Sequence, residues 1–148
     1  MDDARARLET FIDKYAPATA ALARALLARM EARLPGATTI VYDNYNALAI
    51  GFGATDKPSR AVLSLAVYPN WVRLFFLQGA GLADPHGLLE GSGSRVRSVR
   101  LPAPESLDDP RLDALIAQAA ARSEPPFDPG AEPRLIVKSV SAKQRARR

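Results

Sequence analysis

The sequence contains no cysteine, which excludes disulfide bonds, thiolate metal sites and cysteine nucleophiles. Histidine is almost as scarce, because His86 is the only one. A serine triad needs a histidine to accept the proton, and tetrahedral zinc sites draw mainly on histidine and cysteine, so both are disfavoured. His86 follows an Asp-Pro pair, and no Gly-x-Ser-x-Gly motif lies nearby. We interpret it as an exposed loop residue and expect a protein that is not an enzyme.

Long apolar runs are also missing, since none approaches the roughly 20 residues that span a bilayer. The N-terminal stretch MDDARARLETF has no apolar core of signal-peptide length. We therefore expect a cytoplasmic protein with no membrane partner. A length of 148 residues suits one domain. We predict a single domain over residues 1–140 and a disordered basic tail over residues 141–148, SAKQRARR.

The net charge of +4 is unevenly distributed. Residues 134–148 hold six basic side chains and no acid, which leaves 14 basic and 16 acidic side chains in the rest of the chain. The excess positive charge therefore belongs to the tail and does not indicate a globally basic surface. Our second functional hypothesis is therefore a nucleic-acid-associated accessory domain that uses this tail, and the affinity of the tail for nucleic acid should fall steeply with salt.

Apolar residues at helical spacing predict three helices. The first starts at Asp2 or Asp3, and its apolar stripe is Leu8, Phe11, Ile12 and Tyr15. The second begins at Pro17 and ends before Pro35-Gly36. The third begins after Asp109 and ends near Ser123.

Alternation with a period of two predicts strands over residues 38–43, 48–52, 63–67, 71–77, 95–101 and 135–139. The first four are joined by connections too short for crossover helices, which indicates an antiparallel meander. The strand over 71–77 is mostly apolar on both faces, so we expect it to be buried, or nearly so, on both sides. The strand over 95–101 fits a bulge or an edge strand. The predicted fold is α+β: a two-layer sandwich of two N-terminal helices and one C-terminal helix on a mainly antiparallel sheet of five to six strands.

A glycine-rich loop joins the fourth and fifth predicted strands. Five of the nine glycines fall within residues 79–93, and Asp84-Pro85 fits the start of one helical turn. We predict a loop of defined shape held by Gly79, Pro85, Gly87, Gly91 and Gly93. The stretch GSGS at 91–94 precedes two arginines and could cradle a phosphate, but it lacks the P-loop pattern, and a tight turn between secondary elements explains the glycines more simply.

The stretch LFFLQGAGLADPHGLLEGSGSRVRSVRL resembles the signature of the YdhG-like domain family. The resemblance extends to VYDNYNALAIGF upstream and KSVSAKQRARR at the end, so it covers nearly the whole chain. It implies a compact α+β domain. The family is largely of unknown function, and one branch is described as a bacterial frataxin-like iron chaperone. The resemblance thus implies iron as a ligand, although the sequence itself indicates no cofactor.

The leading hypothesis is a non-enzymatic domain that binds a small ligand, a metal ion or a protein partner through the glycine-rich loop and the neighbouring hairpin tip. The candidate binding residues are Tyr42, Asp43, Asn44, Tyr45, Asp84, Glu90, Arg95 and Arg97. The candidate metal ligands are Asp84, Glu90, Asp108 and Asp109. A sheet that binds RNA would interleave exposed aromatic and basic residues, and WVRLF at 71–75 is a fragment of that pattern.

Overall fold

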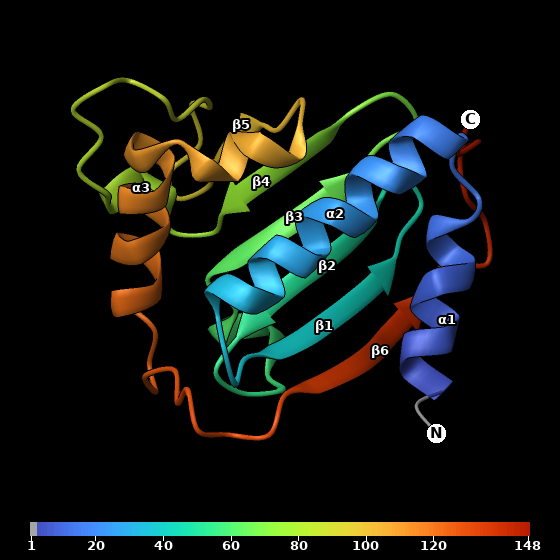
Figure 1. Ribbon diagram of the computed structural model, residues 1–148, viewed down its shortest axis with the longest axis horizontal. Helices are drawn as coiled ribbons and strands as arrows, with labels where there is room; N and C mark the ends of the chain where they lie inside the picture. Colours follow the sequence, from blue (N-terminus) through green and yellow to red (C-terminus); the bar gives the residue numbers. More distant parts are fainter. Residues whose placement is uncertain (1–2) are drawn as a thin grey trace.

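Two helices open the chain in the computed structural model, which describes residues 3–148 (Figure 1). Helix α1 spans Asp3–Ile12 and buries Leu8, Phe11 and Ile12. Asp2, the alternative start for this helix, lies outside the described residues. Helix α2 spans Pro17–Arg33, with proline at its first position, where the missing N–H leaves no hydrogen bond unmade. No helix within residues 3–148 combines the length and apolar character that membrane crossing needs.

The six strands form one sheet in the order β5-β4-β3-β2-β1-β6. Neighbouring strands are antiparallel except β1 and β6, which are parallel. Strand β5 is therefore an edge strand, one of the two alternatives that its mixed pattern predicted. The bounds are Thr38–Asp43 for β1, Leu48–Gly53 for β2, Leu63–Val67 for β3, Val72–Phe76 for β4, Arg97–Arg100 for β5 and Arg134–Val140 for β6.

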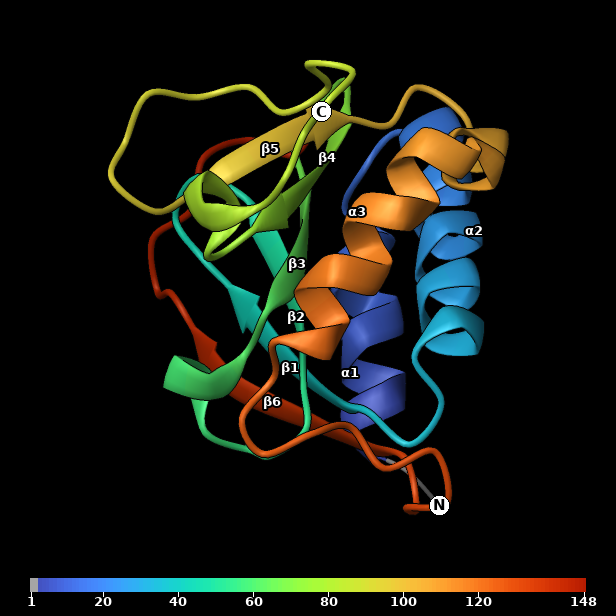
Figure 2. The ribbon, with the colours of Figure 1, turned by 90° about the vertical axis from the view of Figure 1, so that its left-hand side faces the viewer.

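Helix α3 spans Pro110–Ala121, and the Asp109 carboxylate accepts a hydrogen bond from the backbone N–H of Arg111 at 2.9 Å. All three helices cover the same face of the sheet (Figure 2). The core lies between these layers, where Leu26, Met30, Ile50, Phe52, Leu65, Leu74 and Phe76 are fully buried. The predicted α+β sandwich, with helices on one face of a mainly antiparallel sheet, is confirmed.

The opposite face of the sheet is where one sequence-based prediction is wrong. Strand β4 was expected to be buried on both sides, but only Val72, Leu74 and Phe76 are buried, whereas Arg73 and Phe75 are partly exposed. The helices cover only the sheet face that carries Val72, Leu74 and Phe76. Arg73 and Phe75 point to the opposite face, which we call the outer sheet face. This outer sheet face is bordered by the 3₁₀ turn Pro58–Arg60, the glycine-rich loop and the C-terminal segment, residues 141–148 (Figure 2).

Candidate functional site

The tip of the β1–β2 hairpin holds four predicted binding residues, and the structure separates their roles. The Asp43 side chain is completely buried, on the helix-facing side of β1. Tyr42 is partly exposed, and its partner in the ladder is Ala49. A turn hydrogen bond of 3.0 Å from Asn44 N–H to the Ala47 carbonyl closes the hairpin. Tyr45 is 47% exposed. Among these four residues, Asp43 is therefore a structural residue that no ligand can reach, whereas the Tyr45 side chain is accessible to a ligand.

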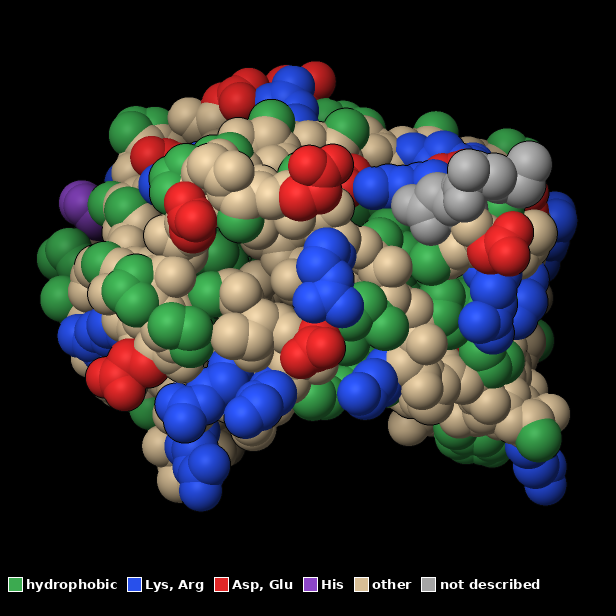
Figure 3. Space-filling view, turned by 90° about the horizontal axis from the view of Figure 1, so that it is seen from below, with side chains coloured by type: hydrophobic (Ala, Val, Ile, Leu, Met, Phe, Trp, Pro, Cys, Tyr) green, Lys and Arg blue, Asp and Glu red, His purple; other side chains and the backbone are tan. Residues whose placement is uncertain are grey.

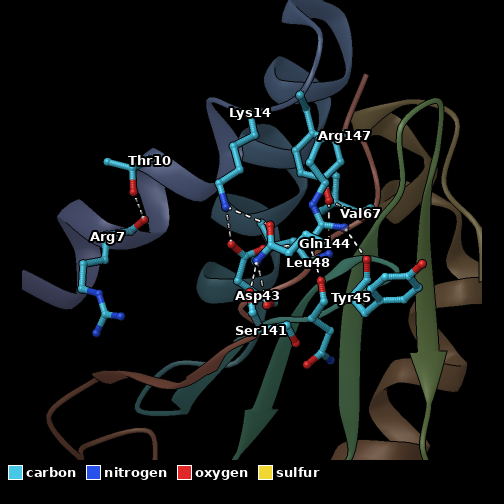
Figure 4. A network of polar contacts seen from close by, with 12 residues as sticks. Arg7, Thr10, Lys14, Asp43, Tyr45, Leu48, Val67, Ser141, Gln144 and Arg147 are labelled. Atoms are coloured by element: carbon cyan, nitrogen blue, oxygen red, sulfur yellow. Dashed lines mark hydrogen bonds and ion pairs between the residues drawn. The ribbon is translucent and has the colours of Figure 1, made fainter.

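The buried Asp43 carboxylate is bound by two cations from distant parts of the chain (Figure 4). The Lys14 ammonium, after α1, lies 2.6 Å from Oδ2, and an Arg147 guanidinium nitrogen lies 3.0 Å from Oδ1. The same guanidinium donates to the backbone carbonyls of Asn44 and Tyr45. Arg147 is only 5% exposed, although its Nε has no hydrogen-bond partner. This network ties the C-terminal segment to the hairpin tip.

Burial and charge act in opposite directions on the pKa of Asp43. Burial raises the pKa because it disfavours the carboxylate, but hydrogen bonds from Lys14, Gln144 and Arg147 outweigh it and leave the pKa below the ordinary 3.8. Burial also raises the pKa of Tyr15 to about 12. Its hydroxyl donates to the Val67 carbonyl at 2.7 Å. Both groups are thus held in one protonation state near neutral pH, as a structural network requires.

The C-terminal segment, residues 141–148, which its composition predicted to be a disordered tail, lies against the hairpin tip. The backbone N–H of Ser141 donates to the Asp43 carbonyl at 2.8 Å, and that of Arg145 donates to the Tyr45 carbonyl at 2.9 Å. Together with the buried Arg147 ion pair, these contacts extend β6 along the hairpin tip. Composition alone does not indicate these contacts, because the carboxylate that pairs with Arg147 lies 104 positions earlier in the chain.

The glycine-rich loop uses its predicted site residues to hold its own shape. The Asp84 carboxylate accepts hydrogen bonds of 2.9 Å from the N–H groups of Leu88 and Leu89, which follow Pro85. The Arg97 guanidinium donates to the carbonyls of Gly93 and Val96 at 2.6 and 2.8 Å. Arg95 is exposed. A loop whose acid and arginine bind its own backbone has few polar groups left for a ligand.

Among the loop glycines, two have backbone conformations that favour glycine and one has a close neighbour. Gly87 and Gly91 have φ angles of +64° and +125°. A Cβ on Gly79 would lie 2.6 Å from the Arg97 Cβ. A Cβ on Gly93 would meet nothing within 4 Å, so this glycine contributes least to the predicted shape.

The four candidate metal ligands are engaged elsewhere. Glu90 pairs with Arg73 at 2.7 Å, Asp108 with Arg29 at 2.5 Å, and Asp109 with Arg111 at 2.8 Å, while Asp84 binds the loop backbone. Glu90 and Asp109 line one hollow, but Asp84 and Asp108 line two others. Within residues 3–148 no three His, Asp or Glu side chains converge in a geometry that could hold a metal. The residues predicted as an iron site therefore do not form one group.

The outer sheet face carries a group of residues that the sequence-based site did not include. Tyr68 and Trp71, at the two ends of the β3–β4 turn, stack with ring centroids 5.6 Å apart and planes 26° apart. Arg73 and Phe75 follow on the same face of β4, and the Arg100 guanidinium lies 5.9 Å from the Trp71 ring centroid. The period-two spacing of Trp71, Arg73 and Phe75 is the signal that would have identified them.

These side chains line two adjoining hollows. The larger, about 550 Å³, is lined by Tyr45, Ala49, Ser64, Ala66, Tyr68, Phe75, Leu77, Ser141 and three further residues of the hairpin tip. The second, about 470 Å³, is lined by Tyr68, Trp71, Arg73 and Arg100, so Tyr68 borders both. We call the two together the outer groove. The lower outline of Figure 3, the side opposite the helices, is hollow between two projections tipped with basic side chains.

Comparisons with models of protein families, with curated proteins and with solved structures give no match to this chain. The resemblance to the YdhG-like family therefore stays an expectation.

Proposed function

We propose that the protein is a non-enzymatic binding domain that takes its ligand in the outer groove. The observation that carries this proposal is that three aromatic side chains, Tyr45, Tyr68 and Trp71, border a concave surface on the sheet face that the three α-helices leave uncovered. Each hollow falls within the roughly 300–1,000 Å³ range of small-ligand sites. Of the two parts of the site predicted from the sequence, the hairpin tip contributes Tyr45 to the outer groove. The glycine-rich loop only borders the outer sheet face.

A binding role fits the placement of the titratable groups. His86, the single histidine, is exposed and lines a hollow beside α3, separate from the outer groove. The charged side chains that line the outer groove are Arg73 and Arg100. Arginine binds anions well but remains protonated, so it is a poor general base. We also propose an intracellular site of action, which a cysteine-free sequence allows.

Amide chemical-shift mapping by NMR tests the proposal. Ferrous iron, inorganic phosphate, nucleotides and short peptides would be titrated in turn, which includes the metal implied by the family resemblance. We expect shifts concentrated on β2, β3, β4 and the hairpin tip. Shifts confined to the glycine-rich loop or to the acids before α3, or none for any probe, would contradict the proposal.

A matched pair of variants completes this test. Ala49 is partly exposed and lines the larger hollow, so Ala49→Leu should obstruct it and weaken binding about tenfold or more. Ala6→Leu adds the same atoms at an exposed position on α1, in the helical layer, and should leave binding unchanged. Equal effects of the two variants would remove the outer groove from consideration.

A further inference from the structure

We propose that the ligand of the outer groove is single-stranded nucleic acid, with bases stacked on its aromatic side chains and phosphates paired with its arginines. This inference rests on the proposed binding role of the groove. It differs from the tail hypothesis because the sheet face carries the recognition, and the basic segment only borders it.

The aromatic side chains provide exposed rings on which bases can stack. Trp71 is 38% exposed and Tyr45 is 47% exposed, the largest exposed fractions among the aromatic residues of residues 3–148. Trp71 is held against Tyr68 by stacking, so its indole is positioned before a ligand arrives. Tyr45 is positioned by its backbone, whose carbonyl accepts hydrogen bonds from Arg145 and Arg147. Because every base has a π-face, each such contact strengthens binding about 5- to 150-fold without reading sequence.

Arginine is interleaved with these rings, as phosphate binding requires. The Arg100 side chain is exposed, and its guanidinium lies over the Trp71 ring, 5.9 Å from the ring centroid. Arg73 donates to the Ser98 hydroxyl at 3.0 Å and to Glu90 at 2.7 Å, so it is fixed in place but partly neutralised. Glu90 does not line the outer groove but lines the neighbouring hollow, which Arg100 also borders. Arg100 is therefore the side chain best placed to bind a phosphate.

Positive charge also borders the opposite end of the groove. Ser141 lines the larger hollow, and the segment that follows carries exposed Lys143, Arg145 and Arg148. Asp43 neutralises only the buried Arg147 of this segment. A strand that runs from Arg100 across Tyr68 to Tyr45 would thus meet basic groups at both ends. A polyanion with planar groups along its length matches this distribution of charge and aromatic surface.

A single strand fits this surface better than a duplex. Bases in a duplex are stacked on one another and present only their edges in the grooves, so they cannot stack on Tyr45 or Trp71. An acidic peptide would satisfy the arginines, but it offers no planar groups for the exposed rings. Of the single strand, the duplex and the acidic peptide, only the single strand can therefore stack on the exposed rings, and an experiment that detects stacking distinguishes them.

Trp71 is the only tryptophan, so its fluorescence reports binding directly. The full chain would be titrated with single-stranded oligo-dT and oligo-U of roughly 12 nucleotides, a duplex of the same length and a polyglutamate peptide. We expect the single strands to quench Trp71 and to bind at least tenfold more tightly than the duplex. The logarithm of the affinity should fall linearly with the logarithm of the salt concentration, with a slope of about 0.7 for each phosphate bound.

Two variants at exposed positions test the contacts. Tyr45→Ala keeps the backbone carbonyl that anchors the C-terminal segment and should weaken binding about fivefold or more. Arg100→Gln should weaken binding and lower the salt slope by about 0.7. Arg7→Gln, which removes an exposed arginine from α1 in the helical layer, is the matched control and should bind as the unmodified protein does. Thermal unfolding of each variant verifies that the fold is kept.

Several results would overturn the inference. One is that the duplex binds as tightly as the single strands. Another is that Tyr45→Ala and Arg100→Gln bind the single strands as tightly as the unmodified protein does. A third is that polyglutamate quenches Trp71 fluorescence and the single strands do not. In each case, shifts of groove amides with another probe would still support the proposed binding role. If no probe shifts the groove amides, the binding role and the nucleic-acid inference fall together.

Discussion

Replacing Arg147 by methionine would test whether the C-terminal segment is part of the fold. Methionine keeps the apolar length that packs near the Tyr15 ring, where the guanidinium carbon lies 5.8 Å from the ring centroid, and it removes only the charge and its hydrogen bonds. The fully buried Asp43 would then keep one cationic partner, Lys14, whose side chain is 40% exposed. The carbonyls of Asn44 and Tyr45 would each lose the guanidinium as a donor.

Breaking a buried ion pair by removing one partner destabilises a protein by about 3–5 kcal/mol. Because Lys14 remains beside Asp43, we expect the lower end, about 3 kcal/mol at pH 7. At about 2–4 °C per kcal/mol for a chain of this size, the melting temperature should fall by roughly 6–12 °C. Arg148→Met changes an exposed neighbour on the same segment and should alter the free energy of unfolding by less than about 0.5 kcal/mol.

The pH dependence provides a second readout of the same contact. Because the folded pKa of Asp43 is below the ordinary 3.8, its ion pairs add stability above about pH 4, and this stability is lost as the pH falls through the folded pKa. The difference in unfolding free energy between Arg147→Met and the unmodified protein should therefore shrink below about pH 4. Urea unfolding followed by circular dichroism at several pH values measures both quantities.

A double-mutant cycle with Asp43→Asn completes this test. Because the two side chains are in direct contact, we expect a coupling energy of about 1 kcal/mol or more. If Arg147→Met unfolds with the free energy of the unmodified protein at pH 7, and the cycle gives no coupling, then residues 141–148 are not docked on the hairpin, and the described border of the outer groove is wrong.

Three further predictions concern other parts of the fold. Since burial raises the pKa of Tyr15 to about 12, its neutral hydroxyl adds stability that is complete below about pH 10 and is lost as the pH rises toward 12. Urea unfolding of Tyr15→Phe should lack this alkaline loss of up to about 3 kcal/mol. Gly91→Ala should destabilise the protein by about 1–2 kcal/mol because of its positive φ, whereas melting of Gly93→Ala, with open space at the Cβ, should be nearly unchanged. Asp84→Ala should speed amide hydrogen exchange in the glycine-rich loop but leave ligand binding in the outer groove intact, and equal loss of binding would return Asp84 to the site.

Local patterns in the sequence were sufficient for the elements and for the fold class. Two such patterns are the helical spacing of Leu8, Phe11 and Ile12 and the period-two alternation from Thr38 onward. Each depends only on residues that are close in the chain, so it predicts an element without knowledge of what that element packs against. Ala16, at the N-cap position of α2, has only a methyl side chain, and it makes no capping hydrogen bond. The short turns between strands were enough to predict the meander from β1 to β4.

Only the tertiary structure decided which residues form a surface and which form a core. Asp43 and Arg147, 104 positions apart, pair because β6 lies parallel to β1 and carries the chain past the hairpin tip. Trp71, Arg73 and Phe75 line an open groove because all three α-helices cover the other face of the sheet. Neither outcome is encoded by spacing along the chain, since long-range pairing and the choice of covered face depend on how whole elements bury their apolar sides. The sequence determined the strand, and the layer opposite it determined that one side of the strand is open to a ligand.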